Sequence, residues 1–145
     1  MATKTLTGAN SVILLSIAGL YPVPQPLQGY AADDVTDIQP IKPAEIMTGV
    51  DGKLSGGYVY TPTVQTITLQ GDSASNDIFD AWYASQQAIN ELYYAQGIIQ
   101  LPAVGKTFVL SKGFLTSYPP MSDVKKLLQA RKFEITWETV VVAPL

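Results

Sequence analysis

The chain has 145 residues, a net charge of −3 and a pI of about 4.7, and it contains neither cysteine nor histidine. The absence of cysteine removes thiol nucleophiles and disulfides, and the absence of histidine removes the commonest general base and metal ligand. The negative net charge argues against electrostatic binding of nucleic-acid phosphates. Only 14% of the residues are charged and 47% are hydrophobic, which favours a single domain (1–145) whose neutral surface is covered by other subunits.

The first predicted element is a buried strand at about residues 10–18, which is rich in Val, Ile and Leu. The apolar run from Val12 to Leu20 is shorter than the ~18 residues that suggest a membrane span. The preceding residues also lack the basic-then-apolar order of a signal peptide. We therefore expect no membrane partner.

A long extended loop is predicted at about residues 21–43, because alternating prolines remove backbone donors and favour unpaired chain. Loops of this length usually bind something or lack fixed structure. Its acidic stretch lacks EF-hand spacing, so no metal is expected there. We expect this loop to contact a neighbouring subunit or ring through Pro22, Pro24, Pro26, Tyr30, Asp33, Asp34 and Asp37.

The next pattern is typical of a hairpin, since a strand at 44–50 is followed by Asp51-Gly52, a strong two-residue turn signal. Asp51 and Lys53, at this turn, are also expected to contact another subunit. A long strand is predicted at 58–70, with Pro62 indicating an edge position or a bulge.

The single clear helix is predicted at about residues 76–93, with Ser73 or Ser75 at its start and Gly97 as its terminator. Its apolar residues recur at spacings of three, four and seven, which defines one buried stripe. These residues are Ile78, Phe79, Trp82, Ile89, Leu92 and Tyr93.

Three late strands are predicted at about 98–101, 107–118 and 133–142, with a short helical turn from Ser122 to Leu128. In the last strand, Phe133, Ile135 and Trp137 share one face, which predicts packing against the core. Glu134, Thr136 and Glu138 share the other. The total predicts a mainly β (α+β) fold, a sandwich or barrel of six or seven strands with one flanking amphipathic helix.

No catalytic motif emerges, so the chain is not expected to be an enzyme or to bind a cofactor. Glu134 and Glu138 are about 13 Å apart along a strand, whereas paired carboxylates of glycoside hydrolases lie ~5–9.5 Å apart. The eight tyrosines leave a carbohydrate-binding sandwich as an alternative function. The tyrosines considered for sugar stacking are Tyr58, Tyr60, Tyr83, Tyr93, Tyr94 and Tyr118.

Residues 63–82, TVQTITLQGDSASNDIFDAW, run from a Thr-rich strand through Asp-Ser-x-Ser-x-Asp into an aromatic amphipathic helix. This order resembles tail tube proteins of contractile-tailed bacteriophages, whose fold is shared with type VI secretion tubes. The resemblance implies hexameric rings that stack on a tape-measure protein inside a tail sheath and conduct DNA into the host. It also implies a place in the virion tail after assembly in the host cytoplasm.

The polar face of the last strand, Glu134, Thr136 and Glu138, is expected to line the lumen of such a tube. Six subunits of net charge −3 would carry 6 × −3 = −18, and a negative lumen would repel passing DNA. Deleting residues 23–38 is expected to leave a folded monomer that does not assemble.

Overall fold

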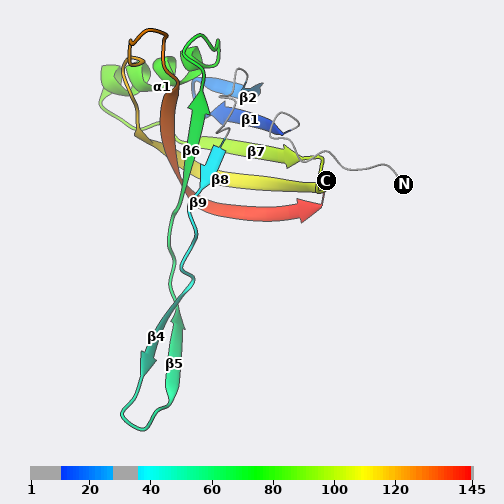
Figure 1. The fold of residues 1–145 in the computed structure, drawn as a ribbon, viewed down its shortest axis with the longest axis vertical. Coiled ribbons are helices and arrows are strands. Elements are labelled where there is room, and N and C mark those ends of the chain that lie inside the picture. The colour runs from blue at the N-terminus through cyan, green and yellow to red at the C-terminus, as the bar shows by residue number, and fades with distance from the viewer. Residues whose placement is uncertain (1–10, 28–35, 145) are drawn as a thin grey trace.

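The computed structural model describes residues 11–27 and 36–144, which form one curled antiparallel sheet, one helix and a protruding hairpin (Figure 1). The sheet has seven strands in the order β2-β1-β7-β8-β9-β6-β3. Its strands are β1 (Val12–Ile17), β2 (Tyr21–Pro26), β3 (Thr36–Ile38), β6 (Thr63–Leu69), β7 (Ala95–Leu101), β8 (Lys106–Ser117) and β9 (Arg131–Pro144). The hairpin consists of β4 (Ala44–Thr48) and β5 (Leu54–Tyr58), and the helix is α1 (Asn76–Ile89).

This architecture confirms the predicted mainly β class with seven main strands and one flanking helix. The barrel alternative is wrong, because the sheet is open and ends at β2 on one side and β3 on the other. The curled sheet instead forms sandwich-like layers. No helix within the described residues is long and apolar enough to cross a membrane.

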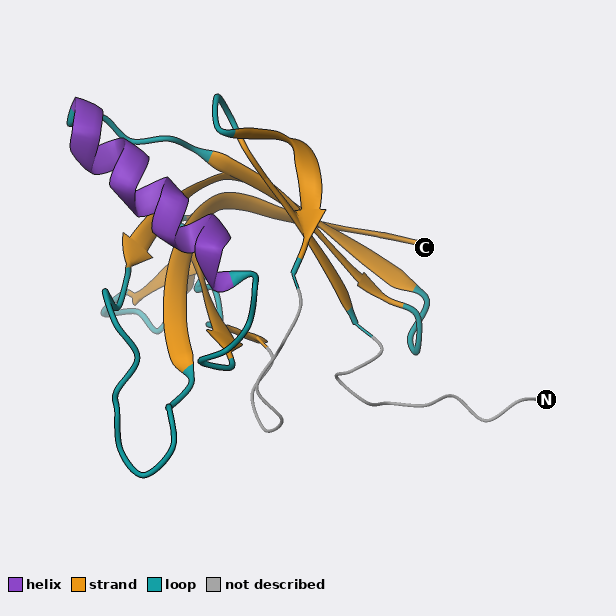
Figure 2. Ribbon diagram, turned by 90° about the horizontal axis from the view of Figure 1, so that it is seen from above, coloured by secondary structure: helices purple, strands orange, loops and turns teal. Residues whose placement is uncertain are grey.

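Helix α1 packs across one face of the sheet, as Figure 2 shows. Phe79 and Trp82, from the predicted apolar stripe, are completely buried. The Phe79 ring stacks on Phe133 of β9 with centroids 4.1 Å apart, and the Trp82 indole donates a hydrogen bond of 3.1 Å to the Tyr93 carbonyl oxygen. The helix is thus fixed to the sheet by aromatic burial.

The helix ends earlier than the sequence suggests. Asn90 adopts a left-handed conformation with φ of 56° and stops the helix, a role that the sequence analysis assigned to Gly97. Gly97 lies instead in β7, where a Cβ atom would come within 3.1 Å of the Trp137 ring. Close packing against the core therefore explains this glycine better than helix termination.

Strand β9 connects the two layers of the fold by changing its partners. Residues 131–137 pair with β6, while residues 134–144 pair with β8. At the bend, the Trp137 ring covers Gly113 so closely that a Cβ atom there would lie 2.5 Å from it. Because glycine has no side chain, the sheet can curl around Trp137 at this position.

The alternating prolines do not form the unpaired loop that we expected. Residues 21–26 pair with β1, and residues 36–38 pair with β6. The Leu27 amide donates a hydrogen bond to the Ile13 carbonyl oxygen of β1 (2.9 Å). Because the backbone nitrogens of neighbouring residues in a strand point to opposite sides, the nitrogens of Pro24 and Pro26 point away from β1. An edge strand tolerates proline on this outer side, since no ladder hydrogen bond is lost.

Two further predictions need correction. The single strand predicted at 58–70 is divided into β5 and β6 by four residues that include Pro62. The helical turn predicted from Ser122 to Leu128 is absent, and a β-bridge joins Val124 to Leu128 instead. Here Gln129 donates its amide hydrogen to the Asp123 carbonyl oxygen (3.0 Å), which closes an irregular loop.

Candidate assembly surface

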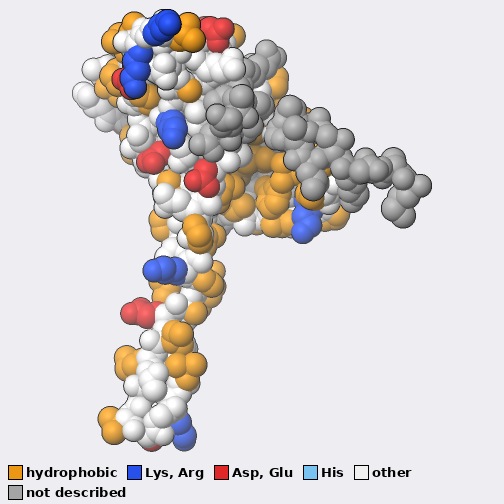
Figure 3. Space-filling model, viewed as in Figure 1, with side chains coloured by type: hydrophobic (Ala, Val, Ile, Leu, Met, Phe, Trp, Pro, Cys, Tyr) orange, Lys and Arg blue, Asp and Glu red, His pale blue; other side chains and the backbone are white. Residues whose placement is uncertain are grey.

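The β4–β5 hairpin, here called the arm, projects far from the body of the molecule (Figures 1 and 3). Every residue of its two strands is exposed. Its tip, at Gly49–Lys53, follows the predicted turn: Gly52 has φ of 84° and the Lys53 amide donates to an Asp51 carboxylate oxygen (3.1 Å). A two-stranded ribbon alone is at best marginally stable in water, so the arm gains little stability from its own pairing.

The two faces of the arm differ in chemistry. Ile46 lies opposite Gly56, and Thr48 lies opposite Leu54, so one face presents large apolar side chains. The other face carries Glu45 and Met47 with small partners. Ile46, Leu54 and Tyr58 together make the first face an exposed apolar surface, as orange side chains along the arm show in Figure 3.

A second unpartnered surface is the outer edge of β9 beyond Trp137. Within the described residues, Glu138–Pro144 pair with β8 on one side and with no strand on the other. This stretch contains Thr139, Val140, Val141 and Val142, which favour the β conformation, and has no charge after Glu138. Val141 and Val142 are each 55% exposed. Such an edge readily accepts a strand from another chain.

A groove of about 600 Å³ lies beside this open edge, where the arm leaves the body. Tyr58, Tyr60 and Pro62 line it on the side of the arm, and Glu138 and Val140 line it on the side of β9. At Pro62 the chain diverges from β9 toward the arm. The β9 edge beside this groove is therefore accessible.

The other two edges of the sheet are protected in different ways. Strand β2 carries the outward-directed prolines, which cannot donate to an added strand, and β3 has only three residues. The β9 edge is therefore the best template for strand addition among the described edges of the seven-stranded sheet.

The polar face of β9 lies opposite the core, as the alternation predicts. Phe133, Ile135 and Trp137 are buried, whereas Glu134 and Thr136 are partly exposed. The register places Asp37, Thr66 and Glu134 side by side in one row across β3, β6 and β9.

This polar face is nearly balanced in charge. Asp37, Glu134 and Glu138 contribute −3, while Lys132 and Lys112 contribute +2, a sum of −1. Lys112 lies 3.9 Å from Glu138. The strongly negative surface inferred from the net charge of the chain is therefore not concentrated here.

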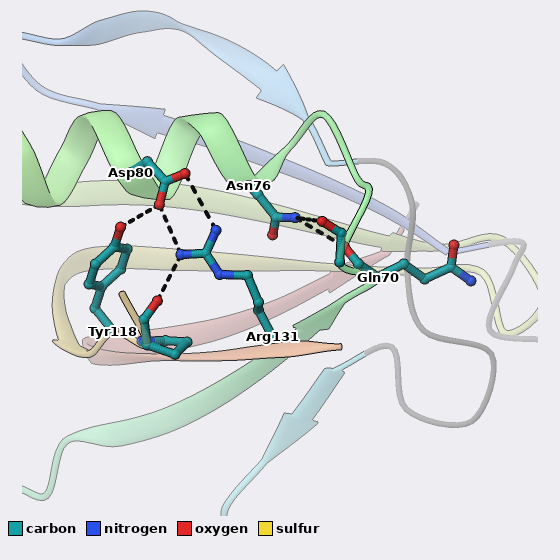
Figure 4. A network of polar contacts seen from close by, with 7 residues as sticks. Gln70, Asn76, Asp80, Tyr118 and Arg131 are labelled. Carbon is teal, nitrogen blue, oxygen red and sulfur yellow. Dashed lines mark hydrogen bonds and ion pairs between the residues drawn. The ribbon is translucent and has the colours of Figure 1, made fainter. Parts of the chain in front are cut away.

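A polar cluster fixes α1 to the start of β9 (Figure 4). Arg131, which is 7% exposed, donates to Asp80 of the helix (2.9 Å) and to the Pro119 carbonyl oxygen (2.7 Å). The Tyr118 hydroxyl donates to the same carboxylate. Asp80 and its partner Arg131 are 51 residues apart, so no local sequence pattern indicates this role of Asp80.

Burial by itself raises the pKa of Asp80, but the hydrogen bonds from Arg131 and Tyr118 and the positive charge of Arg131 outweigh it, so the pKa is lowered. For Tyr118, burial and the hydrogen bond to Asp80 raise the pKa. The Asp80 carboxylate thus adds stability above its unfolded pKa, and this stability is lost as the pH falls through the lower folded value.

Replacing Asp80 with Asn should lower the free energy of unfolding at pH 7 by roughly 1–2 kcal/mol, since buried Arg131 loses its counter-ion and Asp80 is partly exposed. Urea unfolding from pH 7 to pH 3 measures this effect. The difference from wild type should shrink at the acidic end. Glu91→Gln, an exposed control, should change little. Equal effects of the two substitutions would contradict this role for Asp80.

The predicted contact residues do not form one continuous surface. Asp51 and Lys53 lie at the tip of the arm, Pro22, Pro24 and Pro26 lie on the β2 edge, and Asp37 joins the polar face. Tyr30, Asp33 and Asp34 fall outside the described residues. The open β9 edge and the apolar face of the arm were missed, although the uncharged run 139–143 and the apolar residues around Asp51-Gly52 were visible in the sequence.

The tyrosines considered for sugar stacking are distributed over separate parts of the fold. Tyr83 and Tyr118 stack on each other at 4.4 Å, which covers one face of each ring. Tyr58 and Tyr60 meet edge to face at the base of the arm. No single platform of parallel tyrosine rings is present among the described residues.

The fold itself has known relatives among solved structures. A chain of the anti-feeding prophage (AFP) baseplate matches with a TM-score of 0.60 and 10% identity, over 99% of this chain and 98% of that one. A chain of the AFP tube terminating cap matches with a TM-score of 0.60 and 10% identity, over 100% and 95%. A chain of the PVC sheath-tube complex, an extracellular contractile injection system, matches with a TM-score of 0.53 and 15% identity, over 92% and 88%.

These matches show that the chain shares its fold with chains of contractile injection systems. The model of the family "tail fiber protein gp32" matches residues 4–141, nearly the whole chain, so the chain belongs to that family. No curated protein sequence is similar enough to count as a relative.

Proposed function

We propose that the chain is a non-enzymatic subunit of a tail tube, which assembles into stacked hexameric rings. The observation that carries this proposal is the presence of two unpartnered surfaces, the open β9 edge and the apolar arm, on one chain. A ring closes when each subunit covers the edge of the next. Stacking then multiplies weak contacts through effective concentration.

The fold favours a tube subunit over a fibre, although the family is described as a fibre protein. Two of the similar structures belong to a sheath-tube complex and to a cap that terminates a tube. We propose a tail sheath protein outside and a tape-measure protein inside as further partners. In this function DNA passes through the tube into the host without specific binding, and the particle assembles in the host cytoplasm.

We further propose that the polar face of Asp37, Glu134, Thr136 and Glu138 lines the lumen. Six subunits would contribute 6 × −1 = −6 from the charges on this face. A slightly negative lining avoids holding DNA, since it offers no cluster of cations. A reconstruction of the assembled particle that placed Glu134 on the outer wall would overturn this assignment.

Replacing residues 44–58 of the arm with a short Gly-Ser linker tests the assembly function. The Val59 amide donates to the Pro43 carbonyl oxygen (3.0 Å), so the ends of the replaced segment already lie together. The variant should unfold at the same urea concentration as wild type but sediment as a monomer when wild type forms large particles. Glu91→Gln, an exposed substitution outside the arm, is the control and should assemble like wild type.

Normal particles from the variant without an arm would contradict the proposal. This replacement is a sharper test than deleting residues 23–38. That deletion would remove the buried core residue Leu27, and also Thr36, whose hydroxyl accepts a hydrogen bond from Gln65 (2.8 Å). It is therefore expected to damage the fold itself.

A further inference from the structure

Residues 119–130, here called the crown loop, form a third exposed surface that the fold holds in place. Arg131 binds the Pro119 carbonyl oxygen at its beginning, and Gln129 binds the Asp123 carbonyl oxygen near its end. Leu128 packs so closely over Gly71 that a Cβ atom there would lie 2.9 Å from it. The loop is therefore pre-organised, which lowers the entropic cost of binding.

The crown loop exposes apolar side chains despite this fixed conformation. Met121, Val124 and Leu127 are each about 70% exposed, and Leu128 is half exposed. A groove of about 450 Å³ runs beside them, lined by Met121, Lys125 and Lys132 among others. These apolar side chains are rimmed by cations, since Lys125 and Lys126 interrupt them and Lys132 follows.

The charge of this region is opposite to that of the rest of the chain. Residues 119–130 contain two Lys and one Asp, a sum of +1, so the remaining residues carry −3 − 1 = −4. Arg131 is already paired with Asp80, which leaves the lysines for an external partner. A second copy of this acidic chain is therefore an electrostatically suitable partner.

The crown loop and the arm lie at opposite ends of the longest axis of the molecule (Figure 1). They cannot meet within one chain, but two copies arranged head to tail would bring them together. The apolar face of the arm, with Ile46 and Leu54, matches the apolar loop. Residues 44–58 contain two carboxylates and one lysine, a sum of −1, which is opposite in sign to the lysines of the loop. A contact between two different surfaces can repeat along an axis without closing into a ring, as stacking requires.

We propose that the crown loop of one copy receives the arm of the next copy along the stack. This inference rests on the proposed tube function and specifies which surfaces join successive rings. It assigns the arm to stacking and leaves the open β9 edge for contacts within a ring. The crown loop is thus a docking site, and the Asp80–Arg131 pair supports its conformation.

Disulfide trapping tests the contact directly, because the natural chain contains no cysteine. Val50, at the tip of the arm, and Val124, in the crown loop, are both exposed, so Val50→Cys and Val124→Cys should fold normally. Under oxidation, a mixture of the two variants should form covalent dimers at least about tenfold faster than either variant alone. The double variant should form a ladder of longer covalent chains.

Val104→Cys, in the exposed turn between β7 and β8, replaces Val124→Cys in the control mixture. If electron microscopy shows normal particles but no disulfide joins positions 50 and 124, the crown-loop contact is overturned while the proposed tube function stands. A predominant disulfide between position 50 of two copies would also overturn this contact, because it would show that the arm of one copy contacts the arm of another. Absence of both particles and bonds would overturn the tube function and the contact together.

Discussion

Replacing Gly113 with Ala should lower the free energy of unfolding by about 1–3 kcal/mol, the range expected for forcing a methyl group into a filled core. A Cβ atom at this position would lie 2.5 and 2.6 Å from two carbons of the Trp137 ring and 2.8 Å from Ile135. The ring cannot move aside easily, because its Nε1 donates a hydrogen bond of 2.8 Å to buried Gln65. Urea unfolding of monomeric protein measures the loss.

Gly57→Ala is the matched control for this substitution. Gly57 also lies in a strand, but a Cβ atom there would have no neighbour within 4 Å. The control should leave stability unchanged or raise it slightly, because alanine reduces the conformational entropy of the unfolded chain. Equal stability of the two variants would mean that Trp137 does not pack against Gly113 as described.

Replacing Val141 with Lys should weaken self-assembly by roughly tenfold or more while leaving the monomer folded. Val141 is half exposed on the open edge of β9, where an added strand would have to bury the new charge. Natural sheets use edge lysines in this way to prevent association. Sedimentation velocity over a range of protein concentrations measures the change.

Val23→Lys makes the same chemical change on the edge that prolines protect. Val23 is exposed in β2, next to Pro22 and Pro24. Since this edge is not expected to accept a strand, the variant should assemble like wild type. Assembly lost in Val23→Lys and retained in Val141→Lys would show that the ring closes through β2.

Local patterns predicted the elements whose formation depends on neighbouring residues. The helical stripe identified Phe79 and Trp82 as core residues, and strict alternation identified the buried side of β9. Asp51-Gly52 correctly indicated the hairpin turn, because its backbone requirements are local. Each of these signals lies within a few residues of the structure that it specifies.

Features that depend on distant partners could not be predicted in this way. The prolines of β2 indicated an unpaired loop, since nothing nearby shows that β1 accepts their strand. Gly97 was assigned to a helix end, because its true neighbour, Trp137, lies 40 positions away. Likewise, the open edge of β9 exists only because β6 ends its pairing at Thr63, opposite Trp137.

The low charge of the candidate surfaces is the part that the sequence indicated. The low fraction of charged residues suggested association, and both exposed surfaces are poor in charge. The location of the crown loop relative to the arm, however, follows only from the fold (Figure 1). Composition thus suggests that a chain associates, whereas the surfaces available for association follow from topology.

Electron microscopy of the concentrated, purified chain tests the central claim most directly. We expect hollow rings and stacks of rings with a continuous lumen, because copies of the chain cover the β9 edge and the arm of their neighbours. Sedimentation of the same sample should show a monomer that is depleted as concentration rises. A sample that remains monomeric and shows no ring at any accessible concentration would contradict the account.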